Sequence, residues 1–135
     1  MKKIVATPDA PRAIGPYSQA TSIGLESPPA GRQRLLFLSG QIPLDPRTGE
    51  LVKGTIEEET RRVMENLGAV LLAGGGGFQH VLRCTIYLTD LGDFTKVNEV
   101  YGSYFAAEPP ARATVQVAGL PRGARVEIDG IAVID

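Results

Sequence analysis

The chain has 135 residues and a formal net charge of −1, from 14 basic and 15 acidic side chains, and 43% of its residues are hydrophobic. This is the composition of a globular protein, and we expect a single domain over residues 1–135. The balanced charge gives no general attraction to nucleic acid or to an anionic membrane, and no apolar run approaches the ~20 residues of a membrane helix. The single cysteine, Cys84, excludes an intramolecular disulfide and a multi-thiolate zinc site, so no metal is expected. The N-terminus lacks the apolar segment of a secretory signal, and the cytoplasm is the expected compartment.

The first part of the chain contains three candidate strands. The segments Ile4–Ala6 and Ser18–Gly24 are weakly patterned, whereas Leu35–Ser39 is an apolar run of strand length. The segment Asp45–Gly49 has proline and glycine at positions typical of a turn. The segment Glu26–Gly31, with two adjacent prolines, is expected to form a loop on the surface.

The first helix is expected to begin after Thr55. The Thr55 hydroxyl can cap the helix while Glu58 reaches back toward the cap, as in a capping box. Apolar residues then recur at helical spacing and form one stripe. The stripe consists of Ile56, Val63, Leu67, Val70 and Leu71. Gly74 is expected to end the helix in the left-handed conformation that glycine adopts readily.

The segment Val81–Leu88 alternates between two kinds of side chain, which predicts a strand with one buried face. One face would carry Leu82, Cys84, Ile86 and Leu88, and the other Arg83, Thr85 and Tyr87. A second helix is predicted from about Asp93 to Phe105, with Pro109 and Pro110 preventing its continuation. Its apolar face, interpreted as core packing, would consist of Phe94, Val97, Tyr101, Tyr104 and Phe105.

Two further strands are predicted near the C-terminus, Ala113–Val117 and Arg125–Val133, joined as a hairpin by Gly119–Gly123. The order of the elements favours an α+β fold, a sandwich in which two helices pack on one face of a mixed sheet. The other face would carry a mixture of polar and apolar side chains: Thr85, Tyr87, Thr114, Gln116, Ile131 and Val133. Because this mixture is neither a core nor a well-solvated face, we expect another subunit to cover it.

The predicted hairpin also suggests a site. With the apolar side chains of both strands facing the core, Thr114 would lie beside Glu127, and Arg112 near Asp129. An arginine fork matches a carboxylate, and a nearby glutamate can move a proton to or from a reacting group. The same arrangement describes a cross-strand ion pair worth about 0–1 kcal/mol on an exposed face, and spacing alone favours this structural alternative.

Other reactive side chains have weaker support. His80 follows a run of glycines and is expected to lie in a surface loop, and Cys84 is expected to be a buried, inert thiol. The glycine run, Gly74–Gly77, follows a helix and lacks the lysine of a phosphate-binding loop. Tyr17 lies in a loop with glycine and proline, where an aromatic side chain can cover a pocket.

Five segments, in this order along almost the whole chain, carry a resemblance to a known family. They are Ala13–Ala20, Leu38–Pro43, Val97–Tyr101, Pro110–Val115 and Val126–Val133. Through them the chain resembles the RidA family, also called the YjgF or translation-inhibitor family, whose members are reactive-intermediate imine deaminases. The resemblance implies a chorismate-mutase-like fold and a homotrimer in which the sheets form a central barrel, with active sites between subunits. It also implies hydrolysis of 2-imino acids, such as 2-iminobutanoate and 2-iminopropanoate, to 2-oxo acids and ammonia without a cofactor.

The resemblance assigns roles to individual residues of this chain. Arg112 matches the arginine that binds the substrate carboxylate, and Glu127 matches the glutamate that handles the attacking water and the departing ammonia. Tyr17 matches the tyrosine that closes the cleft, and Gly40 matches a backbone position beside the substrate. Thr114 stands where many members have a cysteine; its hydroxyl can keep the hydrogen bond, so hydrolysis is expected to survive.

Two other functions stay open. The first is a metabolite-binding regulatory module that uses the same cleft without turnover; Arg112 favours the enzyme, whereas Thr114 keeps this alternative in play. The second is the endoribonuclease or translation-inhibitor activity ascribed to some relatives. Balanced charge and the lack of a basic cluster mixed with aromatic residues argue against an RNA surface, so nucleic acid is not an expected partner.

Overall fold

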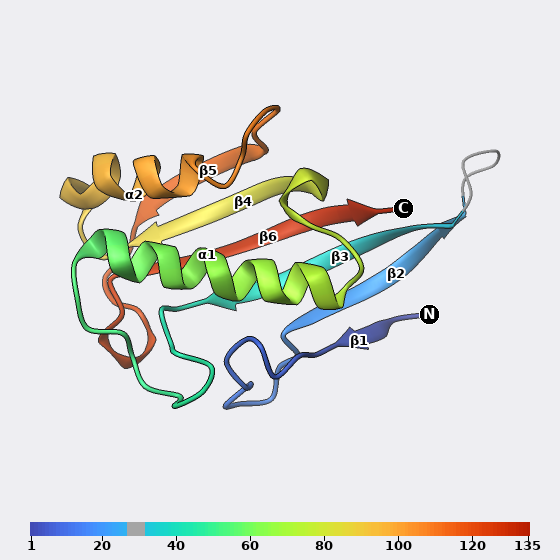
Figure 1. The fold of residues 1–135 in the computed structure, drawn as a ribbon, viewed down its shortest axis with the longest axis horizontal. Coiled ribbons are helices and arrows are strands. Elements are labelled where there is room, and N and C mark those ends of the chain that lie inside the picture. The colour runs from blue at the N-terminus through green and yellow to red at the C-terminus, as the bar shows by residue number, and fades with distance from the viewer. Residues whose placement is uncertain (27–31) are drawn as a thin grey trace.

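The computed structural model describes residues 1–26 and 32–135 and contains a six-stranded sheet with two helices on one face (Figure 1). The strands are β1 (Lys3–Val5), β2 (Ala20–Glu26), β3 (Arg32–Gln41), β4 (Val81–Leu88), β5 (Ala111–Gln116) and β6 (Val126–Ile134). The helices are α1 (Ile56–Ala73) and α2 (Phe94–Gly102). This confirms the α+β class predicted from the order of the elements. All but the first residue of the loop predicted at Glu26–Gly31 lies outside the described residues.

The strands lie in the order β1-β2-β3-β6-β4-β5. Neighbouring strands are antiparallel except for β4 and β5, which are parallel, so the sheet is mixed as predicted. Parallel neighbours need a crossover connection, and α2 forms it between β4 and β5 (Figure 1). The last strand, β6, therefore lies inside the sheet, while β1 and β5 form its edges.

The predicted C-terminal hairpin is wrong. β5 and β6 are not neighbours, because β4 lies between them: Cys84 pairs with Arg112 on one side and with Gly130 on the other. The sequence favours a hairpin because a short connection between two strands usually makes one. Here the connection, residues 117–125, passes the end of β4 before the chain enters the sheet again.

The register also corrects the predicted faces of β5. Arg112, Thr114 and Gln116 pair with the alternate residues of β4 that are buried beneath the helices, as Cys84 is. Paired residues share a face of the sheet, so these three side chains lie on the helix side. Glu127 alternates with buried residues of β6 and faces the opposite side. The expected group of a guanidinium, a hydroxyl and two carboxylates on one face does not form within one chain.

Two apolar side chains predicted for the core are exposed. Val115 is 42% exposed because it shares the open face with the outward residues of β4. Leu82 is 53% exposed because the pairing of β4 with β6 is irregular between Val81 and Arg83. Such an irregularity turns a side chain away from the face that strict alternation gives it.

Helix α1 begins as predicted. The Thr55 hydroxyl accepts a hydrogen bond from the Glu58 N–H at 3.1 Å, and the whole predicted apolar stripe is buried. The end of the helix differs by one residue. Gly74 is still right-handed, and the left-handed residue is Gly75, with φ +97°.

Helix α2 is shorter than predicted and ends at Gly102. Tyr104 and Phe105 lie beyond it, yet both pack on Phe78, with ring centroids 5.2 and 5.6 Å away. The apolar periodicity therefore identified Val97 and Tyr101 correctly as buried, whereas Tyr104 and Phe105 are only partly buried, and it placed the helix end too late. Among the described residues, no helix has the length and apolar character needed to cross a membrane.

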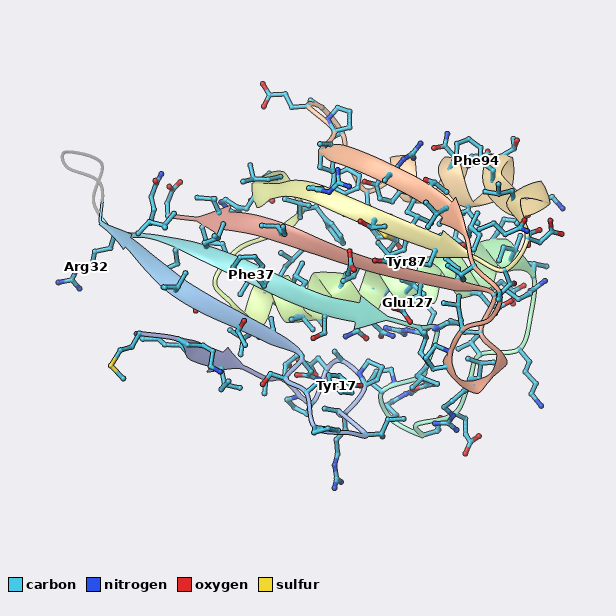
Figure 2. All side chains as sticks on the ribbon, turned by 180° about the vertical axis from the view of Figure 1, so that it is seen from behind. Tyr17, Arg32, Phe37, Tyr87, Phe94 and Glu127 are labelled. Atoms are coloured by element: carbon cyan, nitrogen blue, oxygen red, sulfur yellow. The ribbon has the colours of Figure 1, made fainter. Side chains whose placement is uncertain are left out.

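The sheet face opposite the helices is uncovered in the part of the chain that the structure describes (Figure 2). Phe37 lies on this face and is 44% exposed; its cross-strand neighbour Ile131 is half-buried, and so is Tyr87, which lies farther along the same face beside Glu127. An isolated chain thus leaves apolar surface open on one side of the sheet. Surfaces of this kind mark contacts with other molecules.

Candidate active site in two parts

Three of the predicted site residues lie together. Tyr17, Gly40 and Glu127 line one pocket of about 310 Å³, and Figure 2 shows Tyr17 and Glu127 on the same side of the molecule. The rest of its wall is mostly apolar and includes Pro11, Ile14, Ile42, Leu44 and Pro121. The pocket therefore combines one carboxylate with an apolar wall large enough for a small organic acid.

Glu127 projects from β6 against Gly40 of β3. A β-carbon at Gly40 would lie 2.9 Å from Cδ of Glu127, so the glycine leaves the space that the carboxylate occupies. Partial burial raises the pKa of Glu127, and the charge of Asp129 raises it further. Asp129 in turn accepts a hydrogen bond from the Tyr87 hydroxyl at 2.9 Å. Glu127 can therefore keep a proton at a pH where an ordinary surface glutamate has lost it.

Tyr17 comes from the loop between β1 and β2. Its N–H donates to the Gly15 carbonyl at 2.8 Å, which closes a tight turn just before the ring. The buried Gln19 anchors the loop. Its side-chain amide donates a hydrogen bond to the Pro11 carbonyl at 2.8 Å, and its backbone carbonyl accepts one from the Ser39 N–H at 3.0 Å. The Tyr17 side chain stays 49% exposed at the pocket while its backbone is fixed.

Arg112 lies elsewhere, between edge strand β5 and helix α2. Its Nη1 donates a hydrogen bond to Oδ1 of Asn98 at 2.5 Å. Its Cζ lies 5.5 Å from the ring centroid of Phe94 and 5.2 Å from that of Tyr101, within the range of cation–π attraction. A second pocket, of about 480 Å³, adjoins the guanidinium. Among the described residues no carboxylate forms an ion pair with Arg112, so its charge is available to a ligand.

The remaining candidate site residues are Thr114, Cys84 and His80, and none of them lines either pocket. The Thr114 hydroxyl is buried and has no hydrogen-bond partner among the described residues. Cys84 is buried as predicted, and burial raises the pKa of its thiol, which keeps it unreactive. His80 accepts a hydrogen bond from the Gly77 N–H at 3.0 Å through Nδ1, so one ring nitrogen serves the turn. No group of three potential metal ligands occurs in the described residues.

The site residues thus fall into two separate parts. The first, which we call the Glu127 pocket, consists of Tyr17, Gly40 and Glu127 on the open side. The second, the Arg112 pocket, lies on the helix side. Because β4 lies between them, the backbones of β5 and β6 are about 10 Å apart across the sheet. The side chains of Arg112 and Glu127 then point to opposite faces of the sheet.

The neighbours of Arg112 are not predicted from the sequence. The spacing of Phe94 and Tyr101 predicts core packing, which holds for the buried Tyr101, whereas Phe94 is partly exposed against the guanidinium. Asn98 lies in the segment Val97–Tyr101 that carries the resemblance, but the sequence predicts no role for it. A signal was present, because residues at positions 94, 98 and 101 share one face of a helix by their spacing.

Comparisons with known proteins agree with this fold. Residues 7–134 match the model of the family described as Endoribonuclease L-PSP. The chain is 61% identical to protein DfrA of Myxococcus xanthus, over 98% of this chain and 95% of that protein. It is 47% identical to 2-iminobutanoate/2-iminopropanoate deaminase of Mus musculus, over 98% and 92% of the two chains.

Among solved structures, E. coli TdcF with bound serine superposes with a TM-score of 0.84 at 40% sequence identity. The alignment covers 98% of this chain and 99% of that one. Both the sequence and the fold thus match over nearly the full length. The chain belongs to the Endoribonuclease L-PSP family, also called the RidA or YjgF family.

Proposed function

We propose that this protein hydrolyses reactive 2-imino acids, such as 2-iminobutanoate and 2-iminopropanoate, to 2-oxo acids and ammonia. We further propose that two protomers of a homotrimer build each active site together. The observation that carries this proposal is the separation of Arg112 from Glu127. One chain has a free cationic group for a carboxylate and a carboxyl group able to hold a proton, but on opposite faces of its sheet.

A second copy of the chain resolves this separation. The Glu127 pocket opens on the same side as the uncovered face, which carries the exposed Phe37 and Val115. A neighbour that packs against this face can present its own Arg112 to the Glu127 pocket. Burial of the apolar face supplies the driving force for assembly, and the shared site then follows from its geometry.

The chemistry needs little beyond positioning. Arg112 of one protomer binds the substrate carboxylate, and Tyr17 and Gly40 of the other enclose the imine carbon. Water forms a bond to that carbon while the electron pair of the C=N bond moves to nitrogen. Glu127 takes protons from the water oxygen and delivers them to the nitrogen, so the C–N bond breaks and ammonia leaves as the C=O bond forms. No step is assigned to Thr114, because it lines neither pocket and its hydroxyl is buried on the helix side of the sheet.

The relatives support this choice of substrate. The mouse relative is named for the deamination of 2-iminobutanoate and 2-iminopropanoate. E. coli TdcF has been crystallised with serine, which has a carboxylate next to a nitrogen-bearing carbon as the 2-imino acids do. A carboxylate-binding arginine beside an apolar wall suits ligands of this kind.

A coupled assay tests the proposal. A threonine dehydratase generates 2-iminobutanoate, and release of ammonia is followed with and without the protein. The wild-type protein should accelerate release, and Arg112→Ala and Glu127→Gln should each remove most of the acceleration. Arg61→Ala, which removes an exposed arginine from α1, is the matched control and should behave as wild type. Equal rates with and without wild-type protein would contradict the proposal.

The same preparation separates the other candidates. Binding of 2-oxobutanoate without any acceleration of imine hydrolysis would identify a metabolite-binding module. The family's description as an endoribonuclease makes RNA cleavage the second catalytic candidate. Cleavage of a single-stranded RNA that survives in moderate salt, together with no imine hydrolysis, would favour that activity.

A further inference from the structure

Three side chains of α2 contact the Arg112 guanidinium. We infer that Asn98 is a positioning residue, which acts with Phe94 and Tyr101 to fix the Arg112 guanidinium in the orientation that binds a carboxylate while leaving its positive charge uncompensated. This inference rests on the proposed function, because it takes Arg112 as the carboxylate-binding group.

The geometry restricts the guanidinium. An arginine side chain has many rotamers, and ordering it costs conformational entropy unless contacts hold it in place. Asn98 accepts from Nη1 at 2.5 Å, and the two aromatic rings lie 5.2 and 5.5 Å from Cζ. All three contacts come from one short helix, so they hold the group against a single rigid element. Four of the five guanidinium N–H groups lie outside the Asn98 contact and can donate to a ligand.

The chemistry of Asn98 matters as much as its position. An amide oxygen accepts a hydrogen bond without neutralising the guanidinium, and aromatic faces attract a cation without adding negative charge. Arg125 in the same protein shows the contrasting arrangement, since it forms an ion pair with the carboxylate of the buried Glu59. Arg125 thus has its charge satisfied internally, whereas Arg112 keeps its charge for a carboxylate from outside.

Asn98 can be changed without disturbing the core. Its side chain is exposed, while Val97 and Val100 on either side of it are buried and pack α2 onto the rest of the domain. Replacing the Asn98 side chain by alanine should therefore leave α2 folded. Thr95, exposed on the same helix, provides a matched control because Thr95→Ala also removes a small polar group.

The test compares Asn98→Ala, Asn98→Asp and Thr95→Ala. Their kcat and KM for 2-iminobutanoate are measured in the coupled assay, and their Kd for 2-oxobutanoate by titration calorimetry. Loss of a hydrogen bond to a charged group should raise KM and Kd of Asn98→Ala about tenfold, with a smaller change in kcat. Asn98→Asp keeps an acceptor but forms an ion pair with Arg112, so its KM and Kd should rise further. Thr95→Ala should match wild type.

The opposite outcome has a distinct signature. If Asn98→Asp binds 2-oxobutanoate as tightly as wild type, or if both variants lower thermal stability without changing KM or Kd, Asn98 is only structural. If the proposed function is wrong, the wild-type protein does not accelerate ammonia release. The Kd values of wild type and the variants for 2-oxobutanoate still test the role of Asn98 in that case. If wild type neither hydrolyses the imine nor binds 2-oxobutanoate, both proposals are wrong.

Discussion

Arg112 and Glu127 face opposite sides of one sheet, on strands that β4 separates. If Arg112 and Glu127 act on the same substrate molecule, catalysis therefore requires the assembled oligomer. A small imino acid held by the guanidinium of one chain can reach only the carboxyl group of another. This relationship leads directly to a test that mixes inactive variants.

Mixing Arg112→Ala with Glu127→Gln should restore activity. Each variant alone has a defect at every shared site. After subunit exchange, some sites receive a native arginine from one chain and a native glutamate from the other, about a quarter of them in a random equal mixture. The coupled assay before and after exchange measures the recovery. No recovery in a mixture shown by mass spectrometry to contain mixed oligomers would mean that each site belongs to one chain.

Phe37→Asp should prevent assembly. Phe37 is an exposed aromatic residue on the uncovered face, and a carboxylate there would be buried without a partner in any oligomer that covers this face. Sedimentation at micromolar concentration should show a 14.4 kDa monomer with an unchanged circular dichroism spectrum and no imine hydrolysis. Phe37→Leu, which keeps the face apolar, is the control. A variant that sediments like wild type would place the subunit contact elsewhere.

Gly40→Ala should reduce catalysis more than stability. The added β-carbon would come within 2.9 Å of Glu127 Cδ, and the flexible end of the glutamate can move aside at little cost to the fold. A shift of about 1 Å in a catalytic group can lower the rate by up to about 100-fold. We expect kcat to fall about 10- to 100-fold with a small change in Tm. Gly24→Ala is the control, since nothing lies within 4 Å of its added carbon.

Stability should depend on pH through Glu127. Burial and the charge of Asp129 raise its pKa in the folded protein above 4.5, the ordinary value of a glutamate side chain. The neutral form is therefore favoured by folding, and this contribution is complete below pH 4.5 and is lost as the pH rises through the raised pKa. Glu127→Gln should gain stability relative to wild type as the pH rises toward 8. Urea unfolding at fixed protein concentration measures this; a difference independent of pH would contradict the raised pKa.

Arg125→Ala should destabilise the fold. The Glu59 side chain is 4% exposed and its carboxylate pairs with Arg125, so removing the arginine leaves a buried charge without its partner. Breaking a fully buried pair costs about 3–5 kcal/mol, and because the Arg125 side chain is 42% exposed we expect a smaller loss here. Replacing both charges should cost less still. Chemical unfolding of Arg125→Ala and of the Glu59→Gln/Arg125→Met double variant checks this. Equal loss in both would show that packing, not charge, is responsible.

Much of the fold could be predicted from local patterns. The Thr55 cap, the buried stripe of α1 and the bounds Val81–Leu88 of β4 follow from short-range chemistry, and the structure has them as expected. The end of α2 could not be placed in this way, because Phe105 packs on Phe78 from beyond the end of the helix and is partly buried there. Periodicity reports which side chains are buried, and tertiary packing decides how the backbone reaches them.

The sequence by itself determined the class of the fold, the charged and reactive residues that can form a site and, through five segments, the family. Only the tertiary structure decided which of those residues can meet. A strand has two faces, and a change of neighbour or register moves a side chain from one to the other. The parallel pairing of β5 with β4 placed Arg112 with α2, and the insertion of β6 between β3 and β4 placed Glu127 with Gly40. Strand order depends on contacts between distant parts of the chain, which no local spacing encodes.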